Sequence, residues 1–366
     1  MRVLYDFQAF SLQKYGGISR YFAGLSRSAG KMGGLQTDRT ILYSENAYLD
    51  PADSLLGKTW GGRLFDGHFN RLYRWNRRYA RFKLKRGGYS LFHPTFFDPY
   101  FLDDLRAPFV VTVHDMIHEL HPEIFGDAEM QIANKKILIE NAAQIIAISE
   151  ATRADIKTIY PDVAEKITVI HHGYQASESR EPPADVPERF ILFVGERWHY
   201  KNFPLFAQAI APLLEEKDLH LLCIGGGSFS QEEKHLFDGL HIRERCVQIN
   251  ASEATLKNAY HKAQVFVFPS KYEGFGLPLL EAFAAGCCVA CSDIPVFHEV
   301  ADDAAVYFDP ENDAHIRSMV GNVLSDLGLR RTLKQKTGER LALFPFSACV
   351  EKTVAVYKHC AKFAAL

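Results

Sequence analysis

The sequence predicts an α/β protein made of two doubly wound domains that face each other across a cleft. Three observations support this prediction. The chain has 366 residues, which is more than one hydrophobic core usually serves. Short apolar runs alternate with longer amphipathic ones, a pattern typical of parallel strands covered by helices. A charged stretch with three prolines, residues 174–189, separates two similar halves and is predicted to be a linker.

Strands are expected wherever a short run is apolar on both faces. In the first half the expected strands are Arg2–Asp6, Thr40–Tyr43, Phe109–Val113, Gln144–Ile148 and Ile167–Ile170. In the second half they are Phe190–Val194, His220–Ile224, Val265–Phe268, Cys288–Cys291 and Ala305–Phe308. The longer amphipathic stretches predict helices, among them Glu129–Asn141, Phe203–Leu214, Leu279–Ala285 and Asp313–Leu324. The two domains are therefore expected at residues 1–175 and 188–345.

Composition excludes several classes of protein. Hydrophobic residues make up 47% and charged residues 23%, so wholesale disorder is excluded. The net charge of −2 excludes a general polyanion binder, and we expect no nucleic-acid partner. No apolar run reaches the length of a spanning helix, and the N-terminus resembles a strand rather than a signal peptide. Seven cysteines, three of them in one apolar stretch (Cys287, Cys288, Cys291), indicate reduced core thiols. The expected location is the cytoplasm.

One local segment departs from this neutral balance. Residues Arg63–Arg86 contain nine Lys or Arg and one acid, Asp66, with aromatic side chains interleaved. A basic, aromatic-rich amphipathic segment can lie on an anionic membrane surface, here the inner leaflet. Equally, it can be a solvated helix whose aromatic side chains belong to the core.

The most informative stretch follows the expected strand Val265–Phe268. It contains a Gly-rich turn, Gly274-Phe275-Gly276-Leu277, and then Pro278, which suits the first turn of a helix. The backbone donors of this turn and the helix N-terminus favour an anion such as a diphosphate. Glu273 lies just before that helix and Glu281 lies about one turn inside it. Because carboxylates do not bind phosphate, polyol hydroxyls are their natural partners.

In this setting the chain resembles the retaining glycosyltransferases of the GT-B type, family four, whose signature is Glu-x7-Glu. The resemblance covers nearly the whole chain and implies the GT-B fold, with two Rossmann-like domains. Further motifs that resemble the family are Lys14–Phe22, Thr112–Asp115 and Val194–Asn202. The segment 346–366 resembles the helix that crosses back to the N-terminal domain. The first domain is thereby implied to be the acceptor side and the second to bind the donor.

The resemblance also implies roles for individual residues. Arg197 and Lys201 would clamp the donor diphosphate, with Arg197 as the second cation because Tyr200 replaces the usual Arg before the lysine. Glu273 would lie beside the donor sugar, and Glu281 would bind the ribose hydroxyls. The backbone of Gly274, Phe275, Gly276 and Leu277 would contact the phosphates in the second domain, and Gly16 and Gly17 would do so in the first. Ordinary turn glycines and two surface cations are the competing interpretations.

His114 follows the expected strand Phe109–Val113, and the resemblance places it beside the reactive centre of the sugar. With His118 and His121 it also admits a metal site, an alternative that Pro122 and the lack of a distant carboxylate cluster disfavour. No metal or other cofactor is expected, since two cations and a helix dipole would offset the leaving charge.

The expected activity is therefore transfer of a sugar from a nucleoside-diphosphate sugar to a glycan or lipid-linked acceptor, with retention of configuration. The motif Tyr15–Phe22 resembles the branch that builds O-antigen and capsule, which favours mannose and GDP-mannose over UDP-sugars. A non-catalytic sugar-nucleotide or glycan binder on the same scaffold is the alternative. An NAD-type dehydrogenase is disfavoured because GxGxxG does not follow the first strand.

Overall fold

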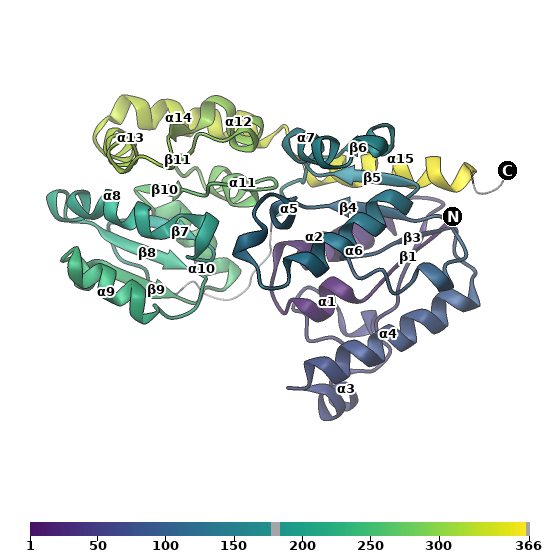
Figure 1. Cartoon of the computed structure of the whole chain (residues 1–366). Helices are drawn as coiled ribbons and strands as arrows, with labels where there is room; N and C mark the ends of the chain where they lie inside the picture. Colours follow the sequence, from purple (N-terminus) through teal and green to yellow (C-terminus); the bar gives the residue numbers. More distant parts are fainter. Residues whose placement is uncertain (177–183, 364–366) are drawn as a thin grey trace. The chain divides into compact units, whose positions relative to one another are not determined.

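A computed structural model describes residues 1–176 and 184–363 of the chain; part of the expected linker, residues 177–183, lies outside the described residues. The chain divides into two compact units (Figure 1). Unit 1 comprises Met1–Gly173 together with the C-terminal segment from Phe346, and unit 2 comprises Tyr174–Pro345. Each is a Rossmann-like α/β unit with parallel strands, which confirms the predicted fold class. The predicted cleft between the domains stays a prediction.

Unit 1 contains two three-stranded parallel sheets with the orders β2-β1-β3 and β4-β5-β6. An isolated parallel bridge between Phe92 and Phe109 connects them. The strands are β1 (Arg2–Tyr5), β2 (Gln36–Arg39), β3 (Leu91–His93), β4 (Val110–Val113), β5 (Gln144–Ala147) and β6 (Ile167–Val169). The helices are α1 (Gln8–Leu12), α2 (Gly17–Ala29), α3 (Lys58–Phe65), α4 (Phe69–Arg86), α5 (Ile117–Leu120), α6 (Ala128–Asn141), α7 (Glu150–Ile159) and α15 (Phe346–Phe363).

Unit 2 contains one six-stranded parallel sheet with the order β12-β11-β10-β7-β8-β9. Its strands are β7 (Phe190–Val194), β8 (His220–Ile224), β9 (Cys246–Ile249), β10 (Val265–Phe268), β11 (Val289–Ser292) and β12 (Val306–Phe308). Its helices are α8 (Phe203–Glu216), α9 (Gln231–Gly239), α10 (Glu253–Lys262), α11 (Leu277–Ala284), α12 (Pro295–Ala301), α13 (Asp313–Ser325) and α14 (Leu327–Leu341). The strand order reverses between β10 and β7, so the carboxyl ends of these neighbours form the switch point at which ligands bind in such sheets.

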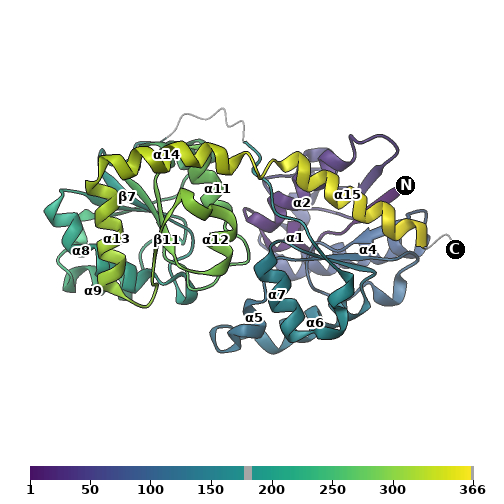
Figure 2. The same cartoon turned by 90° about the horizontal axis from the view of Figure 1, so that it is seen from above.

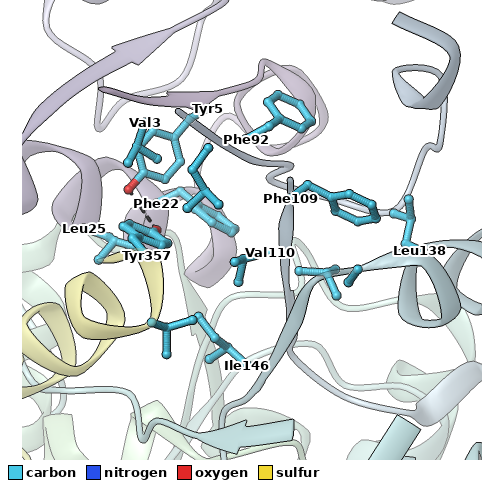
Figure 3. Close-up of a cluster of buried hydrophobic side chains, with 14 of the residues drawn as sticks. Val3, Tyr5, Phe22, Leu25, Phe92, Phe109, Val110, Leu138, Ile146 and Tyr357 are labelled. Carbon is cyan, nitrogen blue, oxygen red and sulfur yellow. Dashed lines mark hydrogen bonds between the residues drawn. The ribbon is translucent and has the colours of Figure 1, made fainter. Parts of the chain in front are cut away.

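The C-terminal helix α15 completes the core of unit 1, where it packs beside α2 (Figure 2). It also contacts β3. Tyr357 of α15 is fully buried, and its hydroxyl lies 2.9 Å from that of Tyr5 in β1 (Figure 3). His93 Nδ1 lies 2.6 Å from the same Tyr357 hydroxyl. Because each buried hydroxyl has a polar partner, the helix is held in one register on the sheet.

One expected strand is wrong. Thr40–Tyr43 is apolar and largely buried, but it forms no strand; the preceding polar segment forms β2 and pairs with β1. The backbone of this run bonds to a side chain instead of to a neighbouring strand. The buried Oδ1 of Asn76, on α4, accepts from the backbone N–H groups of Leu42 at 2.7 Å and Tyr43 at 3.2 Å. The short strand β3 and the strand β9 were not predicted. The cysteines Cys287, Cys288 and Cys291 are buried with free thiols, in agreement with a core role.

Candidate functional site

The Gly-rich turn after β10 leads into helix α11 as the sequence predicts. Strand β10 is fully buried, and Gly276 is the residue before the helix, with a φ of +109° that glycine adopts readily. Pro278 lies within the first turn of α11. The first amide groups of an α-helix have no helical partner, so the N-terminus of α11 can bind an anion.

Lys201 and Glu273 lie together at the switch point of the unit 2 sheet. Lys201 ends a short 3₁₀ turn, His199–Lys201, that follows β7, and Glu273 follows β10. The Lys201 Nζ is 2.5 Å from Glu273 Oε1, and the two side chains are 17% and 15% exposed. The backbone N–H of Lys271 donates to the carbonyl of Tyr200 at 2.7 Å, which ties the two loops together. Two candidate site residues that lie 72 positions apart in the chain are thus in contact.

Glu281 lies on the first turns of α11 and is half-buried. The hydroxyl of Tyr260, from α10, donates to its Oε2 over 3.4 Å. Burial and the neighbouring carboxylate raise the pKa of Tyr260 well above its usual range, so this phenol stays a donor. A carboxylate at this place on the helix can accept hydrogen bonds from vicinal hydroxyls.

Arg197 is buried, and its side chain contacts a carboxylate and a glycine loop. Its Nε donates to Glu233 Oε1 at 2.6 Å, and its Nη groups donate to the carbonyls of Gly225 at 2.5 Å and Gly227 at 2.8 Å. The guanidinium also lies over the ring of Phe229, 4.9 Å from its centroid. The predicted diphosphate contact stays a prediction, and in this structure the donors of Arg197 hold the glycine loop that follows β8.

Sequence reasoning did not identify Glu233 as the partner of Arg197, although a signal was present. Ser230 and Glu233 form a capping box at the start of α9, with Ser230 N–H donating to Glu233 Oε2 at 2.6 Å. The S-x-x-E pattern could have placed this carboxylate at a helix start beside the loop. The guanidinium also accounts for the glycine at position 226, because a Cβ there would lie 2.7 Å from Arg197 Nη1.

Gly16 and Gly17 stand at the start of α2 in unit 1, where Gly16 is the residue before the helix. A Cβ on Gly16 would lie 2.3 Å from Oε1 of Gln13, which accepts from the backbone N–H of Ser19 at 3.2 Å. The absence of a side chain therefore lets Gln13 lie across the helix start. The predicted phosphate contact of these glycines stays a prediction.

His114 lies directly after β4 and is buried. Burial, with smaller contributions from His93 and Lys135, lowers its pKa to about 3, so the imidazole is neutral at pH 7. Its Nε2 has no hydrogen-bond partner among the described residues. The ring stacks on His172 at 5.5 Å between centroids and meets the edge of Tyr21 at 5.6 Å. Sequence reasoning missed His172, which no motif marks.

The metal alternative receives no geometric support. Within residues 1–176 and 184–363, no group of three or more His, Cys, Asp or Glu side chains is placed so that it could hold a metal ion. His118 is half-buried, and its ring lies 4.3 Å from that of Phe125. Independence from metals nevertheless stays a prediction.

The basic segment Arg63–Arg86 contains the last turn of α3 and the whole of α4. The side of α4 that faces the core carries Leu72, Asn76, Ala80 and Leu84. Exposed residues at helical spacing on the other side are Arg71, Trp75, Arg78, Phe82 and Arg86, which we call the cationic face. Trp75 and Phe82 are 43% and 59% exposed, so the core interpretation does not account for them. None of these three arginines has a carboxylate within 4.0 Å among the described residues.

Among the helices that the structure describes, none is both long enough and apolar enough to span a bilayer.

The sequence matches two glycosyltransferase family models and is similar to several known proteins. The family model Glycosyltransferase Family 4 matches residues 15–178, and the model Glycosyl transferases group 1 matches residues 175–340. The chain is 28% identical over 214 residues to the O-antigen chain mannosyltransferase RfbU of Salmonella typhimurium, over 58% of this chain and 60% of that protein. It is 26% identical over 281 residues to the O-antigen chain mannosyltransferase B of Escherichia coli, over 72% and 73%.

A solved structure shares the fold over the full length of both chains. Sucrose-phosphate synthase from Thermosynechococcus elongatus matches with a TM-score of 0.73, covering 100% of each chain at 19% sequence identity. At this identity the likeness concerns the fold.

Proposed function

This chain belongs to the glycosyltransferases of family 4 and group 1, and from that premise we propose that it transfers a sugar from a nucleoside-diphosphate sugar to an acceptor hydroxyl. The configuration at the anomeric carbon is retained. Mannose from GDP-mannose is the favoured donor group, because the two relatives described above are named as mannosyltransferases of O-antigen chains. The acceptor is a glycan or lipid-linked saccharide in surface polysaccharide synthesis.

The contact between Lys201 and Glu273 carries this proposal. It brings a cation and a carboxylate to the switch point of the sheet, beside the N-terminus of α11. A diphosphate needs positive charge and backbone donors, and a sugar needs acceptors for its hydroxyls. In unit 2 the loops that follow β7 and β10 supply the positive charge, the backbone donors and the carboxylate acceptor. Glu281, further along α11, is suited to the ribose hydroxyls.

In the proposed reaction the bond between the anomeric carbon and the diphosphate oxygen breaks, and the acceptor oxygen bonds to that carbon on the same face. The leaving phosphate oxygen takes the proton of the acceptor hydroxyl. Lys201 and the N-terminus of α11 offset the charge that develops on the diphosphate. We assign no metal to this step, since these groups already supply the positive charge.

Further residues have proposed roles that rest on the family. Glu273, oriented by Lys201, accepts hydrogen bonds from the donor sugar, and the backbone of Gly274–Leu277 contacts the phosphates. In unit 1, Gly16 and Gly17 contact the phosphates, and the neutral imidazole of His114 contacts the sugar. For Arg197 we propose an indirect part, through the glycine loop that it holds.

We also propose that the enzyme works at the inner face of the cytoplasmic membrane, where a lipid-linked acceptor is available. The cationic face of α4 supports this proposal, because exposed arginines and aromatic rings together favour an anionic lipid surface.

Two measurements test the function. In a thermal-shift screen against GDP-, UDP- and dTDP-sugars, GDP-mannose should raise the melting temperature most, since a ligand that binds the native state stabilises it. Transfer of mannose to a saccharide acceptor should then be detected, and it should survive EDTA. Binding of the nucleotide sugar without hydrolysis or transfer would favour the alternative, a non-catalytic sugar-nucleotide binder.

A further inference from the structure

Lys135 is a charged side chain inside unit 1 that none of the sequence motifs includes. It lies on α6 and is 1% exposed. Its Nζ lies 2.8 Å from Oε2 of Glu119, whose side chain is 3% exposed, and 5.1 Å from the centre of the Phe97 ring. Withdrawing two charges from water is costly, and apolar side chains of similar size are often as stable in their place. A buried ion pair of this kind therefore calls for an explanation other than stability.

This ion pair holds the chain segment that carries His114. The Lys135 ammonium donates to the backbone carbonyl of Asp115 at 3.1 Å, one residue after His114. Glu119 lies on α5, the helix of four residues that follows. Lys135 thus bonds to the segment at two points. A single helical turn is only marginally stable by itself, so its position depends on such contacts. The ion pair therefore helps to fix the course of the backbone beside His114.

The same segment contains polar atoms that no described residue satisfies. Within residues 1–176 and 184–363, four buried side-chain polar atoms lack a hydrogen-bond partner, and three of them are His114 Nε2, His118 Nδ1 and Glu119 Oε1. Buried polar groups are nearly always paired, and the exceptions call for a reason such as a catalytic role or a bound water or ion. Two observations thus single out this segment: a buried ammonium holds it, and unsatisfied polar groups lie along it.

We propose that Lys135, paired with Glu119, is a positioning residue that fixes His114 for its contact with the donor sugar, an inference that rests on the proposed function. Because Lys135 is 1% exposed, it does not touch a substrate itself, and its effect passes through the backbone at Asp115. A displacement of about 1 Å at a reacting site can lower the rate about 10²-fold. Release of the segment should therefore slow transfer while nucleotide binding persists, because the residues proposed to bind the nucleotide belong mainly to unit 2.

The test is a double substitution in the full chain, Lys135→Met with Glu119→Leu. Lys135→Met alone would leave the buried carboxylate of Glu119 unpaired and would destabilise unit 1. The double variant removes both charges, so its melting temperature should stay close to the wild-type value or exceed it. We expect kcat for transfer from GDP-mannose to fall about 10- to 100-fold, while the affinity for GDP changes less than about 2-fold.

Lys136→Met with Glu140→Leu is the matched control on the same helix. It removes an ion pair of the same residue types, with 3.8 Å between the charged atoms, but the two side chains are 55% and 49% exposed. Both kcat and GDP affinity should stay at the wild-type level in this variant.

The NMR signals of the histidine rings give a second readout that does not depend on activity. The His114 signals, assigned from their loss in His114→Asn, should shift in the double variant and stay in place in the control.

Three outcomes would each contradict the positioning role: wild-type kcat in the double variant, unshifted His114 signals, or a melting temperature far below the wild-type value, which would mean that the pair serves stability. A loss of GDP affinity as large as the loss of kcat would contradict it as well. If the His114 signals shift as expected but the wild type transfers no sugar from any nucleoside-diphosphate sugar, the proposed function fails, whereas the control of the His114 segment by Lys135 stands.

Discussion

Lys201 Nζ lies 2.5 Å from Glu273 Oε1, although 72 residues separate the two in the chain. The pair is mostly shielded from solvent, so its attraction is only weakly screened. Removing either partner leaves the other charge without its neighbour. The ion pair therefore fixes the positions of both charged groups before a donor binds. Substitutions at the two positions should accordingly have coupled effects.

We predict that Lys201→Ala lowers transfer by about 10²-fold or more, the scale for removing one charge-stabilising donor from an active site. The measurement is kcat/KM for transfer from GDP-mannose. Lys336→Ala, which breaks a surface ion pair with Asp303 in the same unit, is the control and should leave transfer unchanged. Wild-type turnover by Lys201→Ala would remove this lysine from the proposed machinery.

The two carboxylates should separate in binding and turnover. Glu281→Ala should mainly weaken binding of GDP itself, because the ribose is present before and during the reaction. Glu273→Ala should mainly depress kcat, because Glu273 is proposed to accept hydrogen bonds from the donor sugar, which GDP lacks. The affinity of each variant for GDP, measured by calorimetry, distinguishes the roles. An equal loss of GDP affinity in both variants would contradict the division.

Arg197→Ala should lower the unfolding free energy of unit 2. Truncating an exposed cation in a cleft would leave that free energy nearly unchanged. Its side chain is 4% exposed and that of Glu233 is 15% exposed. Truncating one partner of such a buried pair costs about 3–5 kcal/mol of unfolding free energy. Arg197→Lys should recover little, since an ammonium cannot reproduce the fork that holds four loop carbonyls. An unchanged melting temperature with lost GDP affinity would instead support a direct contact between Arg197 and the diphosphate.

The buried histidines predict acid sensitivity of unit 1. Burial lowers the pKa values of His93 and His114 to about 3, from about 6.5 in the unfolded chain. The unfolded state therefore binds more protons at low pH. The stability that these neutral rings contribute is complete above pH 6.5 and is lost as the pH falls toward 3.

Urea unfolding of unit 1 between pH 7.5 and 4.5 measures this dependence. His114→Asn removes one titrating group and should reduce the slope by up to about 1.4 kcal/mol per pH unit. His235→Asn, an exposed position on α9, is the control and should keep the wild-type slope. If both variants follow the wild-type slope, His114 does not contribute to the acid sensitivity.

The cationic face predicts binding to anionic liposomes that weakens with salt, with little binding to neutral ones. Arg71→Gln with Arg78→Gln should reduce this binding while transfer to a short, water-soluble acceptor continues. Arg77 and Arg81 are poor choices for the test, because they face Asp98 and Asp104. The control, Arg331→Gln with Lys334→Gln, removes the same charge from exposed positions on α14. Cosedimentation of the Arg71/Arg78 variant at the wild-type level would leave α4 as a solvated helix.

Much of the architecture could be predicted because it depends on local patterns. The strands β7, β8 and β10 have the predicted bounds, since a run that is apolar on both faces and ends in glycine or proline admits few other structures. The turn and helix around Gly276 and Pro278 were predictable for the same reason. The N-cap of α7 is equally local, because the side chain of Ser149 accepts from the N–H of Thr152 three residues later.

The sequence by itself determined the fold class, the Gly-rich turn with its two carboxylates, and the position of His114 directly after a strand. Only the tertiary structure decided which side chains are in contact. The partner of Lys201 is Glu273, whereas Arg197 is occupied by Glu233 and a glycine loop. The amide of Asn76 likewise bonds to the backbone of the apolar run Thr40–Tyr43, which the sequence predicted to be a strand. These outcomes depend on pairs far apart in sequence, whose meeting is set by packing and by the need to pair every buried polar group.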